Sequence, residues 1–125
     1  MSGTSADGID VAIVRIRECK LNPHLTLLAH CGFKYPAALR RAVLAAMNAS
    51  STSTAELARL NWRLGIAYAE AVKATLAKHP VKLDLIGCHG QTLYHQANAR
   101  EYAGRRFACT WKRRSSNRSP TLRPV

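Results

Sequence analysis

The chain has 125 residues, a formal net charge of +12 and 47% hydrophobic residues, which suits one small domain with its own core. No apolar run approaches the ~20 residues of a membrane span, which excludes a transmembrane helix. The polar, glycine-containing start does not resemble a secretory signal peptide, so we expect a soluble, cytoplasmic protein.

The positive charge is concentrated at the C-terminal end. Residues 112–125 carry five basic residues and no acidic one, whereas the first 111 residues carry 14 basic and 7 acidic residues. The terminal segment has too few apolar side chains to fold, so we predict a folded part over residues 1–111 and a disordered basic tail. Such a tail also fits a small nucleic-acid-binding protein, the alternative function, although no aromatic residue lies among its cations.

The four cysteines, at positions 19, 31, 88 and 109, form no Cys-x-x-Cys pair and no zinc-finger spacing with histidine. We interpret them as free thiols in a reducing compartment.

The first ten residues, MSGTSADGID, combine two glycines, three hydroxyl side chains and two carboxylates ahead of an apolar run. Glycine lets loop N–H groups form an anion-binding nest, hydroxyls add donors, and a carboxylate can hold hydrated Mg²⁺. The segment lacks the Gly-Lys-Ser/Thr of a Walker A loop. Two interpretations stay open, a phosphate-binding loop or a polar terminus that runs into a strand.

Two strands and two helices follow. Residues 10–17 and 25–33 are apolar and β-rich, and the breakers between them predict an antiparallel hairpin. Pro36 begins a helix, and a capping box of Ser53 and Glu56 begins a longer helix that Pro80 ends. The buried faces are expected to carry Leu39, Ala42, Val43 and Ala46 in the first helix, and Leu57, Leu60, Leu64, Ala67, Tyr68, Ala71, Thr75 and Leu76 in the second.

Residues 82–88 predict a short buried strand that runs into a polar, glycine-containing turn beginning at His89. Such strand ends are where α/β folds place ligand groups, although His89 can equally be a turn residue held by the backbone. His89 and His95 have no third ligand nearby, so no metal site is predicted. Residues 105–111 predict the last strand.

Three stretches resemble the anhydro-N-acetylmuramic acid kinases. Residues 2–10 resemble the opening phosphate loop of that family, and residues 60–65 resemble its Leu-Asn-x-x-Leu-Gly segment. Residues 87–92, followed by His95, resemble its Gly-Ser-His-Gly-Gln-Thr motif. The three occur in the family's order, and the resemblance covers residues 1–111.

The resemblance implies an α/β fold, part of an actin-like, ribonuclease-H-like ATPase lobe with a mixed sheet and flanking helices. It implies ATP-dependent phosphorylation of 1,6-anhydro-N-acetylmuramic acid with opening of the anhydro ring. The product is N-acetylmuramic acid 6-phosphate, formed during peptidoglycan recycling. Full-length family members tend to be homodimers.

By position, the resemblance assigns an ATP phosphate loop and a sugar-side segment, with Mg²⁺ oriented through water by Asp7 or Asp10 and no direct metal ligand. The phosphate loop comprises Gly3, Thr4, Ser5, Ala6, Asp7, Gly8, Ile9 and Asp10. The sugar-side residues are His89, Gly90, Gln91 and Thr92.

The sequence departs from the family after Trp111, where a Gln-Ile-Gly and then an Asp-Phe-Arg segment are expected. The aspartate of that segment is the expected catalytic base, so no catalytic residue is assigned in this chain. We hypothesise that residues 112–125 are an out-of-frame tail, which the flanking DNA would reveal. The chain is therefore expected to be an inactive fragment of the N-terminal lobe, and a remnant without function is a further alternative.

Overall fold

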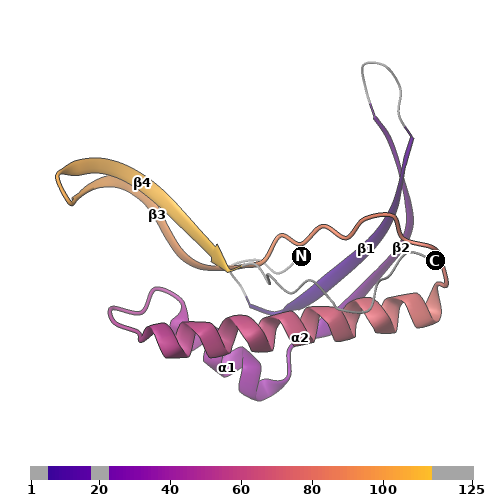
Figure 1. Ribbon diagram of the computed structural model, residues 1–125, viewed down its shortest axis with the longest axis horizontal. Coiled ribbons are helices and arrows are strands. Elements are labelled where there is room, and N and C mark those ends of the chain that lie inside the picture. Colours follow the sequence, from indigo (N-terminus) through magenta and orange to yellow (C-terminus); the bar gives the residue numbers. More distant parts are fainter. Residues whose placement is uncertain (1–5, 18–22, 114–125) are drawn as a thin grey trace.

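The computed structural model describes residues 6–17 and 23–113, in which the elements follow the order β1, β2, α1, α2, β3, β4 (Figure 1). Predictions on residues 1–5, 18–22 and 114–125 lie outside the described residues. They include the first interstrand turn, Cys19 and nearly all of the basic tail, so the division into a folded part and a tail stays a prediction.

The strands predicted for residues 10–17 and 25–33 are confirmed as β1 (Gly8–Arg17) and β2 (His24–Lys34). They pair antiparallel along their whole length, as the predicted hairpin requires. The register of the pairing shifts once, between Ile13 and Val14. A bulge of this kind increases the local twist of the two strands.

Only the half of this hairpin nearest the helices buries its side chains. Ile9 and Ile13 are each 6% exposed, because alternate residues of β1 face α2. At the far end, Ile16, Leu25 and Leu27 are more than 60% exposed, and Figure 1 shows this end projecting away from both helices.

Both predicted helices are confirmed, as α1 (Ala37–Ala46) and α2 (Thr54–Lys78). The N-cap at Ser53 is confirmed, since its side-chain oxygen accepts a hydrogen bond from the Glu56 N–H at 3.1 Å, while the Glu56 carboxylate pairs with the Arg59 guanidinium. The helix α2 ends two residues before Pro80, which has no N–H to continue it.

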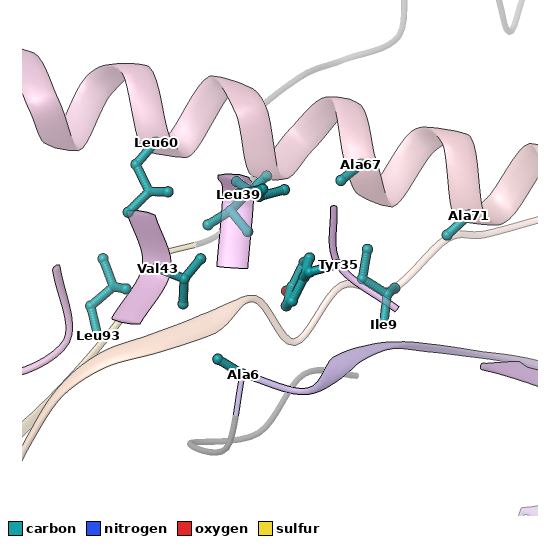
Figure 2. Close-up of a cluster of buried hydrophobic side chains, with 10 residues drawn as sticks. Ala6, Ile9, Tyr35, Leu39, Val43, Leu60, Ala67, Ala71 and Leu93 are labelled. Carbon is teal, nitrogen blue, oxygen red and sulfur yellow. The ribbon is translucent and has the colours of Figure 1, made fainter. Parts of the chain in front are cut away.

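The core lies where α2 crosses α1 and the first hairpin (Figure 2). The predicted stripe of α2 supplies one side of it, with Leu64 only 1% exposed, and Val43 of α1 is fully buried. The whole cluster comprises Ala6, Ile9, Tyr35, Leu39, Val43, Leu60, Leu64, Ala67, Ala71 and Leu93.

The second hairpin consists of β3 (Gln91–Tyr102) and β4 (Arg105–Arg113), which pair antiparallel. The last predicted strand is confirmed as β4. The turn between the strands has positive φ at both central residues, 49° at Ala103 and 74° at Gly104, which matches the right-handed twist of a hairpin.

The strand predicted for residues 82–88 is wrong. This segment is irregular, and its apolar side chains are exposed, Leu85 by 84% and Ile86 by 50%. A strand needs a neighbour for its backbone N–H and C=O groups, and neither described sheet includes this segment.

The expected mixed sheet is therefore not formed by the described residues, whose strands make two separate antiparallel pairs. The coarser expectation, a fold that combines helices and strands, is confirmed. Among the described residues, no helix is long and apolar enough to cross a membrane, and Cys31, Cys88 and Cys109 are free thiols.

Candidate functional site

The described part of the predicted phosphate loop, residues 6–10, is fixed to the core and to β1. Ala6 is fully buried in the core, and Gly8 is the first residue of β1. A Cβ atom at Gly8 would overlap the Phe33 carbonyl oxygen of β2, so the close approach of the two strands requires glycine there. Gly3, Thr4 and Ser5 lie outside the described residues.

The two carboxylates of this loop face solvent, where they can meet a ligand. Asp7 lies 3.9 Å from the Arg40 guanidinium of α1, and its side chain is 75% exposed. Asp10 lies 3.3 Å from Nε2 of His30 on β2, and its side chain is 59% exposed. Exposed pairs of this kind contribute at most about 1 kcal/mol each, so both carboxylates can exchange these contacts for others.

The sugar-side segment begins with the exposed His89 and continues through the buried Gly90 into the core. Gly90 has φ of 77°, a backbone conformation that L side chains rarely adopt, and it turns the chain into β3. Gln91 is 0% exposed, and its side-chain amide donates to the Thr92 carbonyl oxygen at 3.2 Å. His89 stays exposed ahead of this turn.

Tyr35 joins the two predicted segments. Its hydroxyl donates to Oε1 of Gln91 at 3.3 Å and lies 3.4 Å from the Tyr68 hydroxyl on α2. Its ring belongs to the same buried cluster as Ala6 and Ile9 (Figure 2). Residues about eighty positions apart are thus brought into one core beneath both polar segments.

Tyr35 lies outside the sequence motifs that predict the site. It lies just beyond β2, where it continues the inward alternation of Cys31 and Phe33, and this period of two is the signal that could have found it. Its contact with Gln91 could not be found in this way, because it depends on tertiary packing.

His89 makes two polar contacts through its ring. Nδ1 lies 3.1 Å from the Gly90 carbonyl oxygen, and Nε2 lies 2.8 Å from Nζ of Lys112. His95 does not join it, since its Nδ1 lies 2.7 Å from the Thr110 hydroxyl across the second hairpin. Among residues 6–17 and 23–113, no three His, Cys, Asp or Glu side chains are grouped so that they could hold a metal ion.

The Leu-Asn-x-x-Leu-Gly segment lies on α2, and its apolar members belong to the core rather than to a ligand site. Leu60, Leu64 and Gly65 are buried. Trp62 is 59% exposed on the side of α2 opposite to the buried stripe. Tyr68, which the predicted stripe included, packs against the core.

The larger of the two hollows described, about 430 Å³, lies elsewhere, between α1 and the first turns of α2. Its lining includes Leu39, Leu57 and Arg63 but none of the predicted site residues. The second, about 280 Å³, lies along β3 from Tyr94 to Arg100 and includes His95. Neither hollow contains a residue of the two candidate segments.

The chain is similar over most of its length to proteins of one family. The family model described as anhydro-N-acetylmuramic acid kinase matches residues 1–105. The chain is 43% identical over 96 residues to the anhydro-N-acetylmuramic acid kinase of Gloeothece citriformis, and 42% identical over 101 residues to that of Francisella tularensis subsp. novicida. These alignments cover 77% and 78% of this chain.

The chain spans about a quarter of the length of these relatives, 24% and 26% respectively. A third, from Actinobacillus pleuropneumoniae serotype 5b, is 39% identical over 102 residues, with 78% of this chain and 26% of its own length covered. These matches confirm the resemblance to the family, and nothing in them supports the nucleic-acid alternative.

Proposed function

Because the chain belongs to the anhydro-N-acetylmuramic acid kinase family, we propose that it supplies two substrate-binding segments for ATP-dependent phosphorylation of 1,6-anhydro-N-acetylmuramic acid. In this reaction water opens the anhydro ring, ATP supplies the phosphoryl group, and N-acetylmuramic acid 6-phosphate and ADP form. The proposal rests on one observation. Tyr35 and the buried cluster to which it belongs hold the start of β1 and the start of β3 in one core.

The first segment, residues 3–10, would bind the phosphates of ATP. Its described residues fit a nucleotide and its Mg²⁺, since the exposed carboxylates of Asp7 and Asp10 can accept from hydrated Mg²⁺ and the Arg40 guanidinium beside Asp7 can pair with a phosphate oxygen. ATP supplies the phosphoryl group, and the bound cation offsets charge on its oxygens. The chain's own task is to fix the phosphates in position.

The second segment, residues 89–92, would lie on the sugar side. His89 is exposed and polar, so it can hydrogen-bond a sugar hydroxyl. Gln91 and Thr92 are buried, so we propose that their side chains hold the segment in place while the turn at Gly90 presents His89. In this motif, His89 would therefore bind the sugar, whereas Gln91 and Thr92 would hold the segment in position.

The wider setting is also proposed from the family. We propose that the lobe is actin-like, that the protein acts in the cytoplasm where ATP and the sugar meet, and that full-length relatives form homodimers. No catalytic base is proposed among residues 3–10 and 89–92, and we propose that the complete reaction needs further groups.

A chimera tests the proposal. Residues 1–105 would replace the matching segment of the Francisella kinase, to which the chain is 42% identical. We expect formation of N-acetylmuramic acid 6-phosphate that depends on both ATP and the anhydro sugar. A folded chimera that binds ATP but forms no product, while the parent enzyme does, would contradict the proposal.

A further inference from the structure

The ring of His89 is contacted at both nitrogens by groups whose hydrogen-bonding roles are fixed. The Lys112 ammonium, 2.8 Å from Nε2, can only donate, so Nε2 must accept and carry no proton. The Gly90 carbonyl oxygen, 3.1 Å from Nδ1, can only accept, so Nδ1 must carry the proton. The two contacts require the same neutral form of the ring, with its proton on Nδ1.

The backbone explains why Lys112 reaches His89. Lys112 lies opposite Thr92 in the pairing of β3 with β4, and His89 is three residues before Thr92. The turn at Gly90, with φ of 77°, directs the chain so that both side chains lie at the same end of the second hairpin. The strand register therefore places the ammonium beside the imidazole.

We propose that Lys112 is a positioning residue that holds His89 in the Nδ1–H form and in one orientation. Histidine in water favours the opposite form, with its proton on Nε2, so the contact changes the state of the ring rather than preserving it.

The protonation state of His89 does not depend on the proposed function. It can be measured on the 125-residue chain without sugar or ATP. A failed kinase chimera would therefore leave this inference standing, and a wrong tautomer would leave the family and its two segments untouched.

Long-range ¹H–¹⁵N correlation spectra of the ¹⁵N-labelled chain at about pH 8.5, where an ordinary histidine is neutral, report the tautomer directly. We expect His89 in the Nδ1–H form. K112M, which keeps the length of the side chain and removes the donor, should shift His89 toward the Nε2–H form. K112R, which can only donate, should restore Nδ1–H, and K82M, at an exposed lysine outside the hairpin, should leave His89 unchanged.

An Nε2–H form of His89 in the unmodified chain would overturn the inference whatever the variants do. So would an unchanged Nδ1–H form in K112M, provided that its amide spectrum matches that of the unmodified chain. If K112M does not fold, the tautomer of His89 in the unmodified chain and in K112R decides whether the inference holds.

Discussion

A single buried hydroxyl, that of Tyr35, connects the segment before α1 with Gln91 at the start of β3 and with Tyr68 on α2. Its ring is only 6% exposed. Because Gln91 is fully buried, its side-chain oxygen has little access to water if this hydroxyl is lost. At the scale of residues, Tyr35 is therefore one buried polar support of the candidate site.

We expect Y35F to lower the free energy of unfolding by about 1 kcal/mol, the usual effect of removing one such hydrogen bond. Denaturant unfolding measures the change. Y94F is the matched control, since the Tyr94 hydroxyl meets Gln96 at 3.1 Å on an exposed part of β3 and its loss should change stability by less than about 0.5 kcal/mol. Equal effects in the two variants would contradict the importance of the buried contact.

The surroundings of Gly8 and Gly87 predict different effects on stability when each is replaced by alanine. G8A forces a Cβ atom against the Phe33 carbonyl oxygen, so the strands must separate, and we expect a loss of about 1–3 kcal/mol. At Gly87 an added Cβ meets nothing within 4 Å, so G87A should stay within about 0.5 kcal/mol of the unmodified chain. Thermal or denaturant unfolding distinguishes the two, and a neutral G8A would show that β1 and β2 do not approach as described.

At the scale of elements, α2 supports both polar segments, and its first turn depends on Ser53. We expect S53A to destabilise the chain by about 1 kcal/mol, because the Glu56 N–H loses its acceptor at 3.1 Å. S51A, in the exposed loop before the helix, serves as the control and should have little effect. Circular dichroism during denaturation measures both, and equal midpoints for S53A and S51A would argue against the cap.

The elements that the sequence predicts correctly are those with a local signal. The cap at Ser53, the proline at position 80 and the apolar stripe of α2 determine that helix with little help from the rest of the fold. The first hairpin is predicted for the same reason, from two β-rich runs separated by turn residues. The positions of Asp7, Asp10 and His89 on the surface also agree with their polar surroundings in sequence.

The elements that the sequence does not predict depend on pairing over long distances. Residues 82–88 have the composition of a strand, but strand formation needs a neighbour, and neither described sheet provides one. Most of β3 was missed because its apolar content is low, although the Ala103–Gly104 turn marks the hairpin. The burial of Gln91 beneath Tyr35 has no local signal at all.

At the scale of the whole molecule, the two hairpins are long and the core is small. Isolated two-stranded sheets have little stability of their own, and β3 and β4 reach the core mainly through Gln91, Thr92 and Leu93. Apolar side chains such as Leu85 and Ile16 consequently remain exposed. The described residues therefore hold the two candidate segments through one small shared core.

We therefore expect the purified 125-residue chain to show no ATP-dependent turnover of 1,6-anhydro-N-acetylmuramic acid. Phosphoryl transfer requires several groups positioned at once, and general-base catalysis alone contributes about 10²–10⁴-fold. A coupled assay of ADP release with and without the sugar measures this, with the Francisella kinase as the positive control. Sugar-dependent release by the chain alone would show that it carries more of the active site than we assign.

The most direct test of the central claim, that the two segments serve different substrates, is a comparison of KM values in the chimera. We expect D7N or D10N to raise the KM for Mg²⁺-bound ATP about tenfold, equivalent to roughly 1.4 kcal/mol of lost binding, and to leave the KM for the sugar nearly unchanged. H89A should do the reverse. If H89A instead raised the KM for ATP alone, or if all three variants affected both substrates equally, the assignment of the two segments would be contradicted.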